Sequence, residues 1–239
     1  MTFDPIKAMQ LARLLEAAPS GGVAQRLHAP RTDTQAYVIR DPARTILLFP
    51  GTEGARDVRT DLKVSLVSWY AGKVHRGFRA AAMEIWPLTM AAMPPAGKRQ
   101  PLLLAGHSLG GALAQLIAHA AARDHLPLEA VYTYGQPRAG NGGFARAYDA
   151  QPPLHEITFR CVNHRDPIPR VPWLLGRYRH AGREVYLPKT GPAQVERSLW
   201  ARFTEALERW QTPEEPRAAE LAGFADHSLR AYIARLERL

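Results

Sequence analysis

A tight glycine-rich turn between an apolar run and a helix-forming stretch restricts the fold of this sequence more than any other feature. The apolar run covers residues 101–105, the turn covers residues 106–111 with the sequence GHSLGG, and the helix-forming stretch of mainly small residues covers 112–122. A short, continuous apolar run is typical of a parallel strand that is buried on both faces. The segment therefore predicts a strand, a turn and a helix, the repeating unit of an α/β fold.

The remainder of the chain repeats this alternation. Strand-like runs cover residues 35–39, 44–49, 130–134, 156–162 and 183–187, and helical patterns cover residues 3–18, 78–93, 143–148, 194–210 and 226–238. Such a succession predicts a mostly parallel central sheet with helices on both faces. Because 239 residues, 46% of them hydrophobic, are enough for one large core, we expect a single domain over residues 1–239.

The turn also has the form G-x-S-x-G, with Ser108 at its centre and Gly106 and Gly110 on either side. A serine at the apex of a sharp strand-to-helix turn exposes its hydroxyl as a nucleophile, and its neighbours two residues away must be small to avoid a collision. A glycine-rich turn without chemistry is the alternative interpretation. The surrounding strand and helix patterns favour the nucleophile.

Four separate segments resemble the class 3 (filamentous-fungal type) lipases of the α/β-hydrolase superfamily, in that family's order. They are FPGT at residues 49–52, VHRGF at 74–78, the turn at 106–111 with YTYGQPR at 132–138, and NHRDPIP at 163–169. The resemblance covers about residues 35–190, and the last helix adds a histidine. It implies a single α/β-hydrolase domain over residues 1–239 that hydrolyses carboxylic esters without a cofactor.

The resemblance also implies a Ser-His-Asp triad. Its members would be Ser108 as nucleophile, Asp166 as acid and His227 as base. The chain order serine, acid, histidine leaves only His180 and His227 after Asp166, so His180 remains the alternative base. Other histidines inside the motifs, His75, His107 and His164, are interpreted as packing or local hydrogen-bonding residues.

A tetrahedral oxyanion needs hydrogen-bond donors that are already in place. The backbone N–H of Leu109, directly after the nucleophile and at the start of a helix, is one predicted donor. The resemblance gives Thr52 as the second, and Asp61 as the carboxylate that holds the hydroxyl of Thr52. An ordinary helix-capping role is the alternative for Asp61.

The family places a lid just after its oxyanion residue, and the matching segment of this chain is mainly polar. Its only apolar side chains are Ala55 and Val58, which predicts weak activation by an oil surface. Candidate residues for the acyl groove follow in Leu66, Trp69, Tyr70 and Trp173. The lid candidates are Glu53, Gly54, Ala55, Arg56, Asp57, Val58, Arg59 and Thr60.

The histidines and the one cysteine show no metal-binding spacing. No His-x-x-x-His pattern occurs, and Cys161 has no second cysteine for a disulfide or a metal site. The chain also lacks an uninterrupted apolar stretch of about 18 residues and a leader-like N-terminus. With the secreted fungal relatives using disulfides, the single cysteine predicts a cytoplasmic location.

The chain is basic, with 31 Lys and Arg against 22 Asp and Glu and a formal net charge of +9. The basic residues are scattered and belong to no nucleic-acid motif, so nucleic acid is excluded as a partner. Transient contact with an anionic lipid interface fits the charge better. No stable protein partner is indicated.

The leading interpretation is a lipase or esterase that cleaves acylglycerols or similar acyl esters through an acyl-enzyme. Two related activities, phospholipase A1 and aryl-ester (feruloyl-type) esterase, remain open, because the acyl groove rather than the fold decides between them. A protein that reuses the fold only to bind, or to sit on a membrane surface, is the alternative from a different class.

Overall fold

A computed structural model describes residues 1–22, 24–51, 65–172, 177–198 and 223–239. In these residues, one sheet runs in the order β1-β2-β3-β6-β7-β8-β9-β10, and its inner strands β3, β6, β7, β8 and β9 are parallel. The mostly parallel α/β fold predicted from the sequence is therefore confirmed. The strands are β1 (Gln25–Ala29), β2 (Thr34–Arg40), β3 (Thr45–Phe49), β6 (Leu102–His107), β7 (Leu128–Tyr134), β8 (Thr158–Asn163), β9 (Arg183–Leu187) and β10 (Gln194–Val195).

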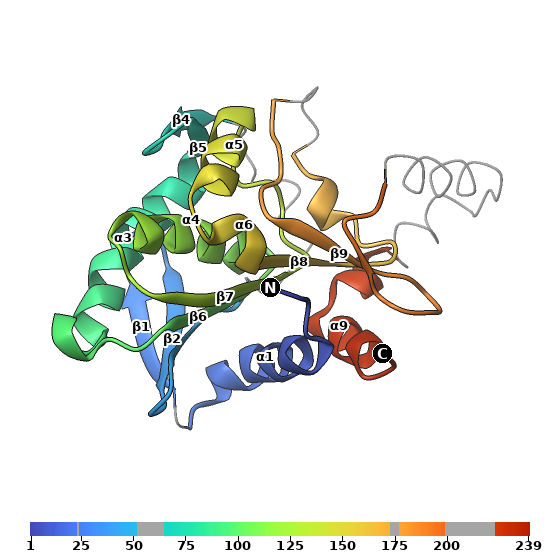
Figure 1. The fold of residues 1–239 in the computed structure, drawn as a ribbon, viewed down its shortest axis with the longest axis horizontal. Coiled ribbons are helices and arrows are strands. Elements are labelled where there is room, and N and C mark those ends of the chain that lie inside the picture. Colours follow the sequence, from blue (N-terminus) through green and yellow to red (C-terminus); the bar gives the residue numbers. More distant parts are fainter. Residues whose placement is uncertain (23, 52–64, 173–176, 199–222) are drawn as a thin grey trace.

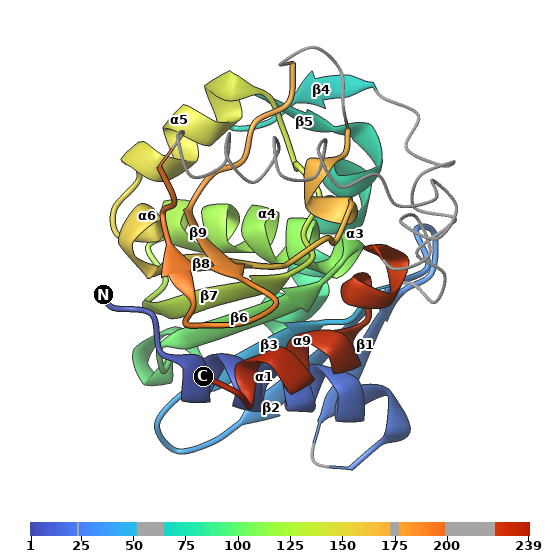
Figure 2. The same ribbon diagram turned by 90° about the vertical axis from the view of Figure 1, so that its right-hand side faces the viewer.

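Helices cover both faces of this sheet (Figure 1). One face carries α1 (Pro5–Ala17) and α9 (Leu229–Leu236), and the other carries α3 (Arg76–Ala92), α4 (Leu109–Arg123), α5 (Gly142–Ala150) and α6 (Leu154–Ile157). Figure 2 shows the sheet between the two layers, with the C-terminal segment (red) lying against α1. Each face has its own apolar cluster, which includes Phe144 and Ile117 on the α4 side and Leu11 and Phe159 on the α1 side.

Smaller elements complete the described chain. A hairpin of β4 (Leu66–Ser68) and β5 (Lys73–His75) lies outside the main sheet, and short 3-10 turns occur at η1 (Ala18–Ser20), η2 (Ala96–Lys98) and η3 (Ile168–Arg170). The structure differs from the sequence-based expectation at residues 194–210, where the described part begins with the short strand β10 instead of a helix. No described helix is long and apolar enough to cross a membrane.

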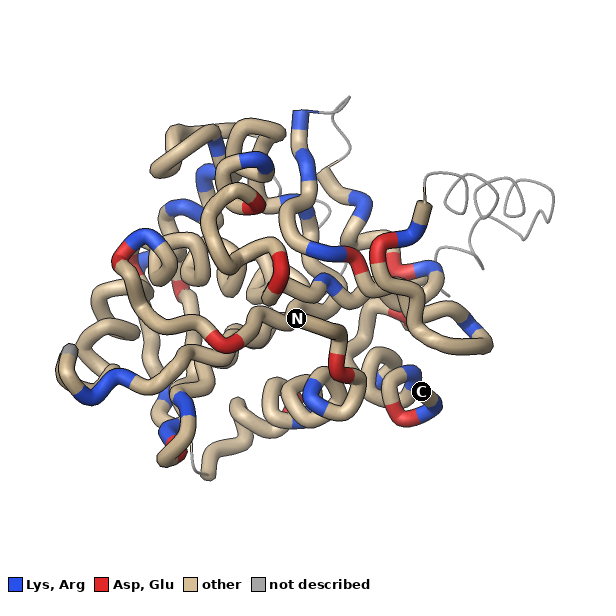
Figure 3. Tube along the Cα trace, in the orientation of Figure 1, with Lys and Arg blue, Asp and Glu red and all other residues tan. Residues whose placement is uncertain are grey.

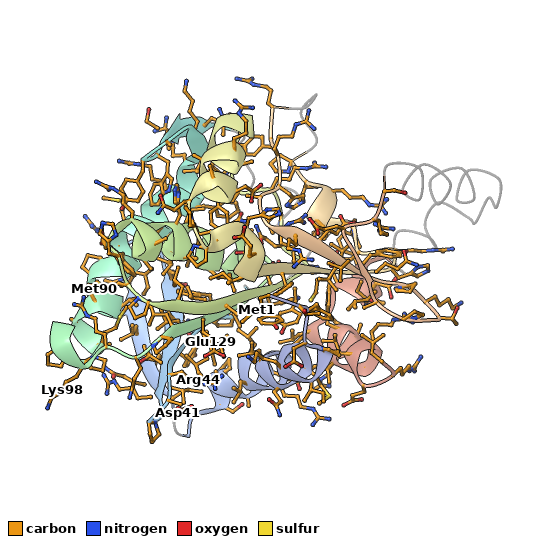
Figure 4. The ribbon with its side chains drawn as sticks, viewed as in Figure 1. Met1, Asp41, Arg44, Met90, Lys98 and Glu129 are labelled. Atoms are coloured by element: carbon orange, nitrogen blue, oxygen red, sulfur yellow. The ribbon has the colours of Figure 1, made fainter. Side chains whose placement is uncertain are left out.

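Charged side chains form ion pairs between neighbouring elements at the end of the sheet where β7 begins. Glu129 on β7 accepts hydrogen bonds from Arg44, before β3, at 2.7 Å and from Lys7 on α1 at 2.9 Å. Figure 4 shows Arg44 beside Glu129 at this end of the sheet, with Asp41 nearby. Parallel strands bring their carboxyl ends together at the opposite edge, so this ion-pair cluster leaves that edge free to carry other side chains.

The turn between β6 and α4 is packed so tightly that only glycine fits at two of its positions. A Cβ added at Gly106 would lie 2.3 Å from the carbonyl oxygen of Gly110, and one added at Gly110 would lie 2.0 Å from the carbonyl oxygen of Phe49. Helix α4 continues from this turn with small residues that are buried throughout, Ala112, Ala114, Ala118 and Ala121 among them. The close packing of α4 on β3, β6 and β7 thus fixes the position of the turn.

We expect Gly110→Ala to lower the free energy of unfolding by about 1–3 kcal/mol or more, because a methyl group cannot enter this space without moving β3 or α4. Urea denaturation followed by circular dichroism measures the change. Gly97→Ala is the matched control, since a Cβ at Gly97 meets no atom within 4 Å. Equal stability of the two variants would show that the turn is looser than described.

Candidate active site

Ser108 stands at the apex of the turn, between the last residue of β6 and the first of α4. Its backbone has φ 54° and ψ −126°, a conformation that residues other than glycine rarely adopt. The Ser108 N–H donates to the carbonyl oxygen of Tyr134 on β7 at 2.9 Å, and its own carbonyl accepts from Gly111 N at 2.9 Å. The strained conformation is therefore held by hydrogen bonds on both sides of the residue.

The structure brings the three predicted triad residues together. His227 Nε2 lies 2.9 Å from Ser108 Oγ, and His227 Nδ1 lies 2.9 Å from Asp166 Oδ2 and 3.0 Å from Asp166 Oδ1. All three side chains are buried, with exposed fractions of 1% for Ser108, 0% for Asp166 and 3% for His227. This chain of contacts is the arrangement in which a histidine can take the proton of a serine while a carboxylate orients its ring.

Asp166 is held by donors from two directions. Its Oδ1 accepts from the backbone N–H of Ile168 at 2.9 Å, and its Oδ2 accepts from the hydroxyl of Tyr232 on α9 at 2.7 Å. The same hydroxyl accepts from Asn163 N at 3.0 Å. Burial, and then the charge of Asp166, raise the pKa of Tyr232 well above its usual value, so the phenol keeps the proton that it donates.

Gly135 lets the acid and the base approach the end of β7. It has φ 61°, and a Cβ there would lie 2.7 Å from both Asp166 Oδ2 and His227 Nδ1. No side chain fits at this position, because it would displace the acid or the base. Residue 135 was part of the YTYGQPR motif but had no predicted role of its own.

His107 lies directly against the base. Its Nε2 is 2.8 Å from the carbonyl oxygen of His227, and the two ring centroids are 4.8 Å apart. A carbonyl can only accept, so His107 Nε2 carries the hydrogen. Burial, with a smaller contribution from His227, lowers the pKa of His107 to about 4. The sequence predicted only packing or a local hydrogen bond here, because nothing local indicates a contact across 120 residues.

Two other histidines, His180 and His75, form hydrogen bonds with nearby backbone groups. His180 Nε2, the alternative base, lies 2.7 Å from the carbonyl oxygen of Pro169, in the loop that follows Asp166. His75 Nδ1 accepts from Gly77 N at 3.2 Å and caps α3. Each of these contacts braces a loop or a helix end.

The structure describes one of the two predicted oxyanion donors, Leu109. Leu109 begins α4, so its N–H is one of the first four of the helix, which have no acceptor within the helix. A Cβ added at Gly51 would lie 2.9 Å from Ser108 Cβ, which places residue 51 against the nucleophile. Thr52, the lid candidates at 53–60, Asp61 and Trp173 lie outside the described residues.

Trp69 and Tyr70, which the sequence predicts at the acyl groove, lie beside the second half of α4. Trp69 Nε1 donates to His119 Nδ1 at 3.1 Å, and the guanidinium of Arg123 lies 4.0 Å from the centre of the Tyr70 ring. His119 is ten residues into α4, roughly 15 Å from its start. The turn of the β4–β5 hairpin carries both aromatics to this part of α4, where Trp69 packs against the core and Tyr70 is exposed. The acyl-groove role of Trp69, Tyr70 and Leu66 stays a prediction.

The described residues contain no group of three His, Cys, Asp or Glu side chains that could hold a metal ion. Cys161 on β8 is buried, and burial raises the pKa of its thiol. Its side chain is packed in the apolar cluster on the α1 side of the sheet.

Comparison with known proteins gives a consistent family. The model of a family described as "Lipase (class 3)" matches residues 46–175. A secreted mono- and diacylglycerol lipase of Fusarium solani is 33% identical over 165 residues, and a lipase of Rhizomucor miehei is 32% identical over 176 residues. The matches cover 66% and 69% of this chain but 48% of each relative, so the chain spans about half the length of these curated relatives.

A solved structure is similar as well. The lipase of Rhizopus microsporus var. chinensis has a TM-score of 0.62 and 27% sequence identity, with 80% of this chain and 74% of that chain covered. The similarity extends over most of this chain, and it agrees with the predicted α/β-hydrolase fold.

The predicted cytoplasmic location is wrong on this comparison, because the Fusarium relative is named a secreted enzyme. The prediction rested on the single cysteine. Cys161 is 1% exposed, and a buried thiol of this kind is compatible with an oxidising or a reducing environment. A count of one cysteine therefore excludes an internal disulfide and says nothing about the compartment.

We expect Tyr232→Phe to lower the free energy of unfolding by about 1.5–3 kcal/mol, because it removes a donor from the buried Asp166 carboxylate. Chemical denaturation measures this loss. Tyr148→Phe is the control: its hydroxyl is equally buried but bonds to the neutral Thr158 hydroxyl at 2.8 Å, and we expect a loss of about 1 kcal/mol. A smaller loss for Tyr232→Phe than for Tyr148→Phe would contradict the role of the phenol at Asp166.

Stability should fall as the pH drops from about 6.5 towards 4, because unfolded His107 binds a proton in this window while folded His107 does not. Between pH 7 and 4.5 this residue accounts for about 2–3 kcal/mol. His107→Gln keeps a donor for the His227 carbonyl but does not titrate, so its stability should change less over the same range. Denaturation of both proteins at the two pH values tests this. If both proteins lost the same free energy of unfolding between the two pH values, His107 would bind its proton in the folded protein as it does in the unfolded one.

Proposed function

This chain belongs to the class 3 lipase family, and we propose that it hydrolyses carboxylic esters of lipids through an acyl-enzyme formed on Ser108. The observation that supports this most directly is the 2.9 Å distance between His227 Nε2 and Ser108 Oγ, with Asp166 bound to the other side of the ring. Acylglycerols are the proposed substrates, since the Fusarium relative is named for mono- and diacylglycerols.

In the proposed reaction, Ser108 Oγ attacks the carbonyl carbon of the ester while His227 Nε2 takes the hydroxyl proton. The tetrahedral intermediate collapses, the bond to the alcohol breaks, and His227 returns the proton to the leaving alcohol oxygen. Water then attacks the acyl-enzyme with His227 again as base. The products are a carboxylic acid, the alcohol and free Ser108.

Asp166 acts in this scheme by orienting the ring and stabilising the imidazolium that forms. Two donors, Ile168 N–H and Tyr232 OH, are directed at its oxygens. These donors fix the position of the carboxylate, so that it holds the imidazole ring while the proton moves between Ser108 and His227. Tyr232 and His107 are positioning residues, since they contact the acid and the base and not the reacting atoms.

The oxyanion is assigned to the backbone N–H of Leu109 and to Thr52. The Leu109 assignment is supported by its place at the N-terminus of α4, where the free N–H groups and the helix dipole favour a negative charge. For Thr52 the support is its sequence position next to Gly51, which is packed against Ser108. Asp61 remains the proposed support of the Thr52 hydroxyl, and residues 53–60 the proposed lid.

Ser108→Ala should lower kcat for ester hydrolysis by about 10⁴-fold or more, because loss of the nucleophile disables the triad as a unit. A fluorophosphonate should label Ser108 in the native protein, as seen by mass spectrometry of the peptides. His180→Ala is the control, since His180 contacts the Pro169 carbonyl and not Ser108. Turnover that survives in a folded Ser108→Ala protein would rule out the serine mechanism.

The head group and the acyl chain length are open to a direct comparison. Activity on p-nitrophenyl esters of increasing chain length, on monoacylglycerol and tributyrin, and on phospholipid vesicles separates acylglycerol lipase from phospholipase A1 and aryl esterase. Vesicle binding without turnover of any ester, in a protein that fluorophosphonate does not label, would replace the enzyme by a membrane-surface protein.

A further inference from the structure

One face of the protein gathers cationic side chains around residues 138–142. We call the basic face the set Lys73, Arg138, Arg146, Arg170, Arg177 and Arg179. These residues come from β5, the loop after β7, α5, η3 and the segment that leads to β9. In Figure 3 the blue segments gather along the upper side of the molecule, over α5 and the loops beside it.

The backbone at residues 140–142 brings these segments together. Gly140 forms bridges to both Val74 and Arg179, and Asn141 N donates to the carbonyl oxygen of Lys73 at 2.8 Å. A Cβ added at Gly142 would lie 3.4 Å from Arg146 Nη1 and 3.6 Å from Arg179 Cγ. Lys73, Arg146 and Arg179 are therefore neighbours although they are far apart in the sequence.

Arg138 and Arg170 extend this group towards the active site. Arg138 Nη1 donates to the carbonyl oxygens of Arg170 and of Pro172, the latter at 2.8 Å. Burial, followed by the charges of Arg179 and Arg170, lowers the pKa of Arg138. The charges of Arg179 and Arg170 thus act on the guanidinium group of Arg138.

The charge of the basic face is not balanced by the carboxylates that the structure describes. None of its six residues takes part in an ion pair with them. Asp149, one turn after Arg146 on α5, accepts instead from Gly182 N at 2.7 Å and lies 3.2 Å from His155 Nδ1. Five of the six side chains are exposed and Arg138 is half-buried, so the face is open to an external anion.

The opposite side of the sheet is different. On α1 and α9, Arg13 pairs with Glu237 at 2.6 Å and Arg230 pairs with Glu16 at 2.8 Å. These two basic residues are thus offset by acidic partners across the two helices, in contrast to the six residues of the basic face.

The basic face continues from two loops beside the triad, the loop after β7 and the loop after β8 that carries Asp166. Arg138 follows Gly135 by three residues, and Gly135 is packed against Asp166 and His227. Arg170 follows Asp166 by four residues. An anionic surface that contacts these arginines therefore lies beside the edge of the sheet that carries Ser108.

We propose that the basic face is a docking surface for an anionic phospholipid bilayer, which holds the catalytic edge against membrane lipids. Several Lys and Arg side chains at one anionic surface add up to strong but salt-sensitive binding. A bilayer fits better than a nucleic acid, because the loops of the face lead to a site proposed to act on lipid esters. The role given to this surface rests on the proposed function. The binding of the surface to an anionic bilayer does not depend on it.

The test uses the full chain with Ser108→Ala, so that vesicles are not hydrolysed. Flotation compares vesicles of phosphatidylcholine alone with vesicles that also contain phosphatidylglycerol, each at low and high salt. We expect binding about 10-fold or more tighter to the anionic vesicles, and loss of this preference at high salt. Equal binding to both kinds of vesicle would overturn the proposal.

A charge-removal variant locates the surface. Combining Arg170→Gln, Arg177→Gln and Arg179→Gln should weaken binding to anionic vesicles by roughly 10- to 100-fold. The control removes the same charge from the other side through Arg13→Gln, Arg230→Gln and Arg238→Gln, and should bind like the parent. Arg177→Gln alone should give a smaller loss and serves if the triple variant does not fold. An equal loss in the control would show that net charge, not the basic face, drives binding.

Two further measurements separate this inference from the proposed function. With Ser108 intact, the triple variant should hydrolyse a soluble short-chain ester at the parent rate and lose rate only on anionic vesicles. Failure of all ester hydrolysis would remove the proposed function and leave the binding result standing. Tighter binding to duplex DNA than to anionic vesicles, lost in the same triple variant, would assign the face to nucleic acid and overturn the bilayer.

Discussion

The steric contact between β3 and the turn after β6 is the constraint on which the site depends. The backbone at Gly110 is packed against the carbonyl of Phe49, and the backbone at Gly106 is packed against that of Gly110. This contact forces the chain to reverse within a few residues, and Ser108 takes a φ of 54° as a result. Strain of this kind costs about 1–3 kcal/mol and persists only where the surroundings fix it. Here the buried alanine helix and the hydrogen bond to Tyr134 supply that rigidity.

Acid and base reach Ser108 by different means. Asp166 comes from the loop directly after β8, so the parallel sheet itself delivers it to the same edge as the turn. His227 comes from a segment outside the sheet, before α9. Side-chain contacts hold that segment in place: His107 donates to the His227 carbonyl, Asn163 Nδ2 donates to the Asp226 carbonyl at 2.9 Å, and the Tyr232 hydroxyl donates to Asp166.

Whether a feature could be predicted from the sequence depends on how far apart along the chain its interacting residues lie. The turn, its strand and its helix were predicted because glycine positions and apolar runs are local signals. The acyl-groove role of Trp69 and Tyr70 stays a prediction, because their residue type fits a groove as well as a core and no local signal decides between the two. The contact of His107 with His227 and that of Tyr232 with Asp166 were not predicted, because the partners lie 120 and 66 residues away. The basic face has the same origin: its arginines are scattered in sequence and meet only in the folded chain.

The position of Tyr232 on α9 makes the integrity of the site depend on the docking of one short helix. Helix α9 spans eight residues, follows His227 directly and packs on α1 and the sheet through Tyr232, Ile233 and Leu236. Segments of this size open separately from the sheet, with a free energy below that of global unfolding. Each such opening removes the base and one donor of the acid together while the nucleophile stays in its turn. Heat would therefore inactivate the protein through partial unfolding of this segment, at temperatures where the sheet is still intact.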